Sequence, residues 1–139
     1  MPREGARYRT ALMSLRPTQR QLVDAVANLV AESDWVTFVQ ISEFLERRGI
    51  RTKGRMNLSL ASDQNVLLWS GMSRPMCDVL LALMDEKRIF AHRASVTAYH
   101  VHGGVLSLPL ADAPRARGLA QPHWLPVAFR VMPPTWALH

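Results

Sequence analysis

The sequence predicts one mixed α+β domain with three helices, a β-hairpin and an additional C-terminal strand. Apolar residues recur at helical spacing in three separate stretches, and short β-prone stretches follow the third of them. Of the 139 residues, 48% are hydrophobic and 20% are charged. This composition is typical of a folded globule, and the length suits a single core.

The first predicted helix begins near Thr18 and ends at Ser33-Asp34. Thr18 and Gln21 have the spacing of a capping box, in which a hydroxyl and a longer side chain satisfy each other's backbone N–H groups. An apolar stripe follows, formed by Leu22, Val26, Leu29 and Val30. This stripe indicates an amphipathic helix buried along one face.

Two further helices are expected over residues 39–49 and from Ser73 to about Lys87-Arg88. Gly49 is typical of a helix terminator, and Ser73 is a preferred N-cap. The segment 50–65 has no clear pattern, although Leu58–Ala61 has the pattern of a single helical turn. Residues 66–69 form a predicted short buried strand.

Residues 89–93 and 96–102 predict a β-hairpin with its turn at 94–95, and residues 105–110 predict another strand. The composition of residues 111–122 is that of a linker, and residues 123–131 alternate enough for a docked strand. We therefore expect a flexible basic arm over 1–16, a domain over 17–110, and a linker with a docked C-terminal segment over 111–139.

Basic charge is the most informative bulk property. Seventeen Lys and Arg face eleven Asp and Glu, which gives a formal charge of +6 and a pI near 10.7, and 15 of these cations are arginine. Arginine presents a planar fork of donors that suits phosphate, so a polyanionic partner is expected. The alternative is that the arginine content reflects a GC-rich genome.

The densest basic cluster falls at the end of the second helix and in the glycine-broken stretch behind it. Such a cluster predicts a phosphate-binding patch, and the alternative is a solvated loop whose arginines cap the helix. Its members are Arg47, Arg48, Arg51, Lys53 and Arg55.

In element order, residues 18–104 resemble the winged helix-turn-helix domain. Residues 35–45 look like its strand-to-second-helix passage, and residues 73–104 look like its third helix and wing. The resemblance implies binding of double-stranded DNA, a role as a transcriptional regulator, and a homodimer. It also implies contacts from Ser73 and Arg74 at the start of the third helix and from Arg93 and Ser95 at the wing.

Two departures from that pattern leave other functions open. More than twenty residues separate Gly49 from Ser73, and the outward face of the third helix carries Asp78, Leu81 and Asp85 instead of base-reading side chains. One alternative is a protein-interaction module that uses the third helix and the C-terminal strand. Another is a single-stranded nucleic-acid binder that uses Trp124 and Trp136 beside Arg130.

No pattern indicates a catalytic site or a cofactor. His92, His100 and His102 form a metal-like group, but surface histidines are the preferred interpretation. The only cysteine, Cys77, is expected in the core, as are Trp35 and Trp69. Because the sequence has no apolar run of membrane-spanning length and no signal-peptide pattern, we expect a cytoplasmic protein that does not bind membranes.

Overall fold

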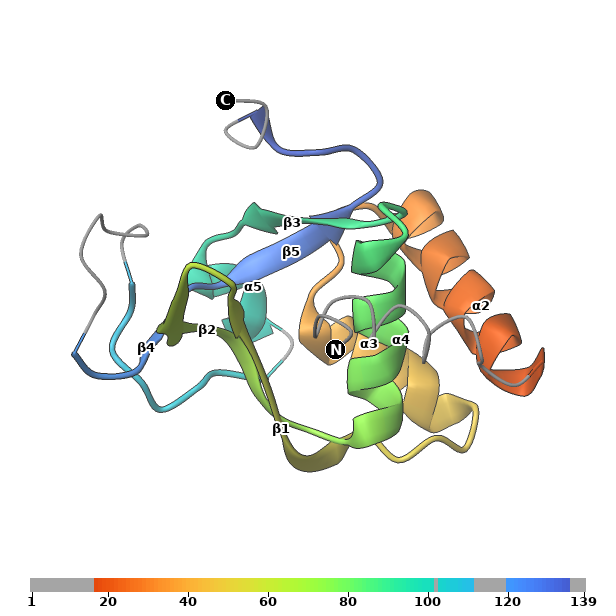
Figure 1. Cartoon of the computed structure of the whole chain (residues 1–139), viewed down its shortest axis with the longest axis horizontal. Coiled ribbons are helices and arrows are strands. Elements are labelled where there is room, and N and C mark those ends of the chain that lie inside the picture. Colours follow the sequence, from red (N-terminus) through yellow and green to blue (C-terminus); the bar gives the residue numbers. More distant parts are fainter. Residues whose placement is uncertain (1–16, 102, 112–119, 136–139) are drawn as a thin grey trace, which may run out of the picture.

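The computed structural model describes residues 17–101, 103–111 and 120–135. Figure 1 shows the longer helices on one side of the molecule and two small sheets, with a short helix beside them, on the other. No helix in these ranges is both long and apolar enough to cross a bilayer. The elements are α2 (Pro17–Ser33), α3 (Phe38–Arg47), β1 (Lys53–Leu60), β2 (Asp63–Met72), α4 (Arg74–Asp85), β3 (Phe90–Arg93), α5 (Val96–Val101), β4 (His123–Trp124) and β5 (Val127–Arg130).

The three predicted helices are confirmed as α2, α3 and α4. The Ser73 hydroxyl accepts a hydrogen bond from the Met76 amide, which is the expected N-cap of α4. The capping box lies at a different helix from the one predicted. Thr18 is already inside α2, which begins at Pro17, whereas Thr37 and Gln40 form a capping box at the start of α3.

The strands form two sheets of unlike topology. In the first sheet β1 and β2 form an antiparallel hairpin, and β4 runs parallel to β2. In the second sheet β3 pairs antiparallel with β5, and Val36 forms a bridge with Phe129 of β5. Val36 and Phe129 exchange both backbone hydrogen bonds, at 3.0 and 2.7 Å, so Val36 lies on the side of β5 opposite β3.

Aromatic side chains join the two sheets to the helices. Phe38 stacks on Trp69 with ring centroids 5.4 Å apart, and Tyr99 stacks on Trp69 at 5.2 Å. Trp124 is fully buried and donates its indole N–H to the Leu68 carbonyl. The Tyr99 hydroxyl donates to the Val127 carbonyl, and burial raises the pKa of this phenol. The core is therefore continuous from the hairpin to β5.

The predicted hairpin over residues 89–102 is wrong in its second half. β3 is a strand as expected, but its partner is β5, and residues 96–101 form the helix α5. The Ser95 hydroxyl accepts from the Thr97 amide at the start of this helix. One turn of helix brings Tyr99 into the core, and this tertiary packing outweighs the β preference of Val96, Thr97 and Val101.

The other corrections concern segments with weak local signals. Residues 58–60 belong to β1 and not to a helical turn, and the predicted strand over 105–110 is irregular except for a bridge between Leu110 and Trp124. Trp35, expected in the core, is 48% exposed. The docked C-terminal strand is confirmed as β4 and β5.

Candidate nucleic-acid interface

The C-terminus of α3 carries the first part of the predicted basic cluster. Arg47 and Arg48 are exposed, and the Arg48 guanidinium carbon lies 4.5 Å from the centroid of the Phe44 ring. The Arg47 Nε donates to the Glu43 carbonyl. Gly49 has a φ of +80°, a left-handed conformation that glycine adopts without strain, and it turns the chain out of the helix.

The start of β1 carries the second part of the cluster and is fixed to the start of α4. The Ser73 hydroxyl donates to the Arg51 carbonyl, and the Ser73 amide donates to the Thr52 carbonyl at 2.8 Å. A Cβ atom on Gly54 would lie 2.6 Å from the Met72 carbonyl oxygen, so only glycine permits this close approach. These backbone contacts hold Lys53 and the following residues beside the N-terminus of α4.

Side-chain hydrogen bonds hold the turn between α3 and β1. The buried hydroxyl of Thr52 accepts from the Ser42 hydroxyl at 2.6 Å and donates to the Glu46 carboxylate. These two hydrogen bonds join α3 to the residue before β1 across the turn. It also gives Glu46, the nearest carboxylate in sequence to Arg47, a hydrogen-bond partner of its own.

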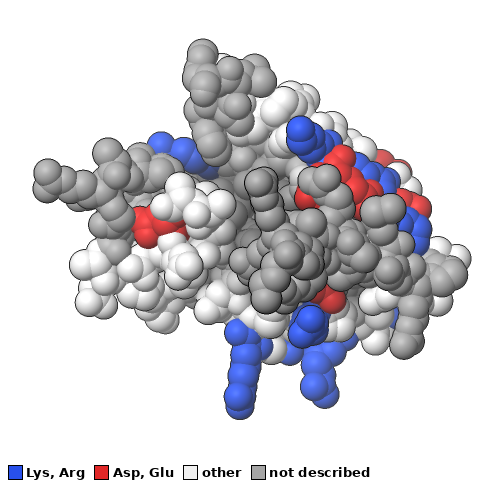
Figure 2. Space-filling view, viewed as in Figure 1, with Lys and Arg blue, Asp and Glu red and all other residues white. Residues whose placement is uncertain are grey.

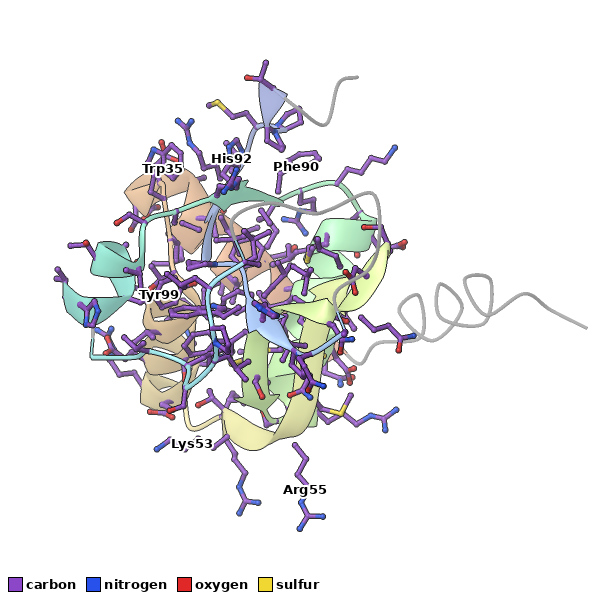
Figure 3. All side chains as sticks on the ribbon, turned by 90° about the vertical axis from the view of Figure 1, so that its left-hand side faces the viewer. Trp35, Lys53, Arg55, Phe90, His92 and Tyr99 are labelled. Atoms are coloured by element: carbon purple, nitrogen blue, oxygen red, sulfur yellow. The ribbon has the colours of Figure 1, made fainter. Side chains whose placement is uncertain are left out.

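The structure therefore brings together six of the nine predicted site residues, which we call the basic end. All six are exposed, and in the described part of the chain none of them takes part in an ion pair. In Figure 3, Lys53 and Arg55 extend from the same end of the molecule into solvent. The members of the basic end are Arg47, Arg48, Arg51, Lys53, Arg55 and Arg74.

The remaining three predicted residues do not join the basic end. Ser73 is 5% exposed and its hydroxyl is used in the cap of α4, so it has no free hydroxyl to offer a base. Arg93 and Ser95 lie at and after the end of β3, and Figure 3 places Phe90 and His92 of that strand far from Lys53 and Arg55. Because 96–101 is helical, these two residues are not at a hairpin tip.

Acidic residues also border the basic end. A cleft of about 530 Å³ lies between α3 and the β1–β2 hairpin, and its lining includes Glu43, Glu46 and Lys53. The surrounding cations still outnumber these two carboxylates. Figure 2 shows basic side chains projecting alone at the bottom of the view, whereas basic and acidic side chains alternate at the upper right.

The aromatic side chains do not offer a stacking surface at the basic end. Trp69 borders the cleft, but Phe38 and Tyr99 both stack on its ring. Trp124, which the single-strand alternative would use for stacking, is fully buried. Trp35 is half exposed, yet the Arg130 guanidinium lies 4.4 Å from its ring centroid, and Trp136 lies outside the described residues.

The cluster around Trp35 was missed by the sequence analysis. Arg130 donates two hydrogen bonds of 2.9 Å to the Asp34 carboxylate, which lowers the pKa of that carboxyl. Asp34 and Trp35 both have positive φ values, of 53° and 49°. Because Asp34 and Arg130 are 96 positions apart, no local pattern in the sequence signals this pair.

The candidate metal ligands do not come together, and the cysteine lies in the core. His92 is buried, with its Nε2 atom 2.6 Å from the Met132 carbonyl oxygen, whereas His100 is exposed on α5 and His102 lies outside the described residues. No cluster of three metal-ligating side chains is present among the described residues. Cys77 is 2% exposed, as expected for a core cysteine, and burial raises the pKa of its thiol.

No protein-family model, curated protein or solved structure matches this chain.

Proposed function

We propose that this protein binds nucleic acid, and double-stranded DNA in particular, through phosphate contacts from the basic end. The observation that carries the proposal is the convergence of six exposed cations, without an ion-pair partner among the described residues, from α3, β1 and the start of α4. Unpaired arginines on one surface bind phosphates and release the counterions condensed on a duplex. Arg74 adds a cation at the N-terminus of α4, whose dipole favours anions.

A duplex is favoured over a single strand because of the aromatic residues. Sequence-tolerant binding of single strands relies on exposed aromatic rings on which bases stack. Phe38 and Tyr99 both stack on Trp69, and Phe44 already contacts Arg48. A surface of cations without a free ring suits the regular phosphate spacing of a duplex.

We further infer that the core is a modified winged helix. The order α2, Val36, α3, α4, β3 and β5 supports this inference, as does the placement of β5 between β3 and Val36. Two insertions distinguish the chain from the usual pattern. The β1–β2 hairpin separates α3 from α4, and the connection from β3 to β5 contains α5 instead of a simple wing.

The third helix of this core does not suit base readout. Six of the twelve residues of α4 are buried, including Met76, Val79, Leu80 and Leu83, and Leu81 is partly buried. The remaining surface includes Asp78 and Asp85, which phosphates repel. We therefore propose a backbone-directed mode of binding, and a role in transcriptional regulation would require a homodimer or a partner to supply sequence selectivity.

Fluorescence anisotropy with duplex and single-stranded oligonucleotides of matched sequence tests the proposal. The informative variant replaces Arg51, Lys53 and Arg55 by glutamine, because the side chains of these residues make no ion pair in the described structure. With each phosphate contact contributing about 0.9 to the log–log salt slope, the slope should fall by about 2.7 and duplex affinity near 0.1 M salt by roughly 500-fold.

A control variant of equal charge replaces Arg20, Lys87 and Arg93 by glutamine, all of which lie away from the basic end. The proposal predicts that this control retains most of the duplex affinity. Equal losses in both variants would show that only net charge matters, and an absence of duplex binding at low salt would refute the proposal. Preferred binding of the single strand would refute the duplex assignment.

A further inference from the structure

An apolar pocket lies at the opposite end of the molecule from Lys53 and Arg55, beside β3. Its volume is about 460 Å³, within the range of roughly 300–1,000 Å³ typical of ligand sites. The hairpin forms one side, and β3 with the segment entering β5 forms the other. The lining residues are Leu60, Ser62, Leu68, Ala91, Arg93, Leu125 and Val127.

The backbone of β3 is open on the side away from β5. Phe129 uses its amide and carbonyl for Val36, so the neighbouring residues of β5 bond to Phe90 and His92 of β3. The Ala94 amide donates to the Pro126 carbonyl, so the same alternation continues past the end of β3. The amide and carbonyl groups of Ala91 and Arg93 consequently point outward, and β3 has no second strand neighbour in the described part of the chain.

The open edge and the pocket share the same two residues. Side chains of alternate strand residues lie on one face, and Ala91 and Arg93 both line the pocket. A strand added along this edge would therefore direct every second side chain toward the pocket. Arg93 is exposed and has no ion-pair partner among the described residues, so it offers a positive charge at the rim.

We propose that this edge binds an extended peptide segment of a partner protein, which adds a strand to β3. The peptide places one apolar side chain in the pocket and an acidic side chain or terminal carboxylate against Arg93. Backbone hydrogen bonds to Ala91 and Arg93 supply affinity, and the pocket and the guanidinium supply selectivity. The site is separate from the basic end and does not depend on nucleic-acid binding.

Selection of random octapeptides displayed on phage, with the full chain as bait, provides the probes. Synthetic versions of the selected peptides are then measured by fluorescence polarisation against the wild type, Ala91→Leu and Arg93→Glu, with folding checked by circular dichroism. We expect the selected peptides to be apolar and to contain Asp or Glu. Each variant should bind them with an affinity about tenfold or more below that of the wild type, a loss typical of hot-spot residues. A lysine in place of the acidic residue should restore binding to Arg93→Glu.

Amide hydrogen exchange gives a readout that does not require a variant. The Ala91 and Arg93 amides should exchange faster than those of Phe90 and His92 in the free protein, and bound peptide should slow the first pair selectively. The proposal is overturned if no peptide is selected or if the selected peptides bind both variants as well as the wild type. It is also overturned if the Ala91 and Arg93 amides gain no protection, or if octanoate occupies the pocket while no peptide binds.

Discussion

Two surfaces of the molecule use arginine in opposite ways. On the side formed by α2 and the end of α4, Arg20 contacts Glu86 at 3.0 Å and Arg88 contacts Asp24 at 2.7 Å. At the basic end, six cations make no ion pair within the described residues. Figure 2 shows the difference as alternating red and blue on one surface and blue side chains that project beyond the red ones on the other. In the proposed function, the placement of carboxylates, and not the number of arginines, decides which surface attracts a polyanion.

The two surfaces also differ in what holds them in place. The surface that carries the Arg20–Glu86 and Arg88–Asp24 pairs, which we call the paired surface, joins α2 to the end of α4 through side chains. Exposed ion pairs of this kind contribute only about 0–1 kcal/mol each. The basic end is positioned by backbone contacts between β1 and the start of α4 and by the Thr52 hydrogen bonds. Its cations are therefore available to a partner without loss of the fold.

Gly54→Ala should have the largest effect on stability among the variants that test this difference. The added Cβ would lie 2.6 Å from the Met72 carbonyl oxygen and 2.8 Å from the Ser73 Cα, so the backbone must move. We expect a loss of about 1–3 kcal/mol in the free energy of unfolding, measured by urea denaturation. Duplex affinity should also fall, because the basic strand shifts away from Arg74.

Gly49→Ala is the matched control for that variant. At Gly49 a Cβ meets no atom within 4 Å, so the cost is limited to the left-handed backbone at φ +80°, about 1 kcal/mol. If Gly54→Ala proves as stable as Gly49→Ala, the close approach of β1 to α4 is not what holds the basic end.

Asp34→Asn tests the ion pair that holds β5 to the end of α2. Asparagine tolerates the positive φ of this position, so the variant removes the charge while the backbone is preserved. Because Arg130 lowers the pKa of Asp34 below its ordinary value of 3.8, the wild type gains stability above about pH 4, and this gain disappears as the pH falls through the folded-state pKa. The melting temperatures of the two proteins should therefore differ at pH 7 and converge as the pH falls below the folded-state pKa of Asp34. A difference that does not change with pH would contradict a charge-based role.

Asp24→Asn combined with Glu86→Gln should have the smallest effect. The change frees Arg20 and Arg88 and makes the paired surface resemble the basic end. Stability should fall by about 0–1 kcal/mol per pair. Duplex affinity at low salt, measured by anisotropy, should rise by less than it falls when Arg51, Lys53 and Arg55 are neutralised. A larger rise would mean that location on the molecule is unimportant.

The helices could be predicted from the sequence because their signals are local. The apolar stripe of α2, the serine cap of α4 and the left-handed Gly49 each depend on residues within a few positions of one another. The basic cluster could be predicted for the same reason, since five of its members lie between residues 47 and 55. Arg74 joins them only because Ser73 bonds back to Arg51 and Thr52.

The strands and the aromatic core depend on distant contacts. Residues 53–57 of β1 are all exposed, so the strand shows no alternation of apolar and polar side chains, and its register is irregular. α5 is only six residues long, too short for helical periodicity to appear. Trp35 is half exposed although a core position was expected, and Trp124 is buried where β4 pairs with β2, far along the chain.

The central claim is that the basic end, and not the paired surface, contacts nucleic acid. Titration of a mixed-sequence DNA duplex into the ¹⁵N-labelled protein, followed by amide chemical shifts, tests it residue by residue. The account predicts shifts concentrated at residues 47–55 and at Arg74 that fade as salt is raised, with residues 20–24 and 86–88 unchanged. Shifts centred on α2 and the end of α4, or no shifts at low salt, would contradict it.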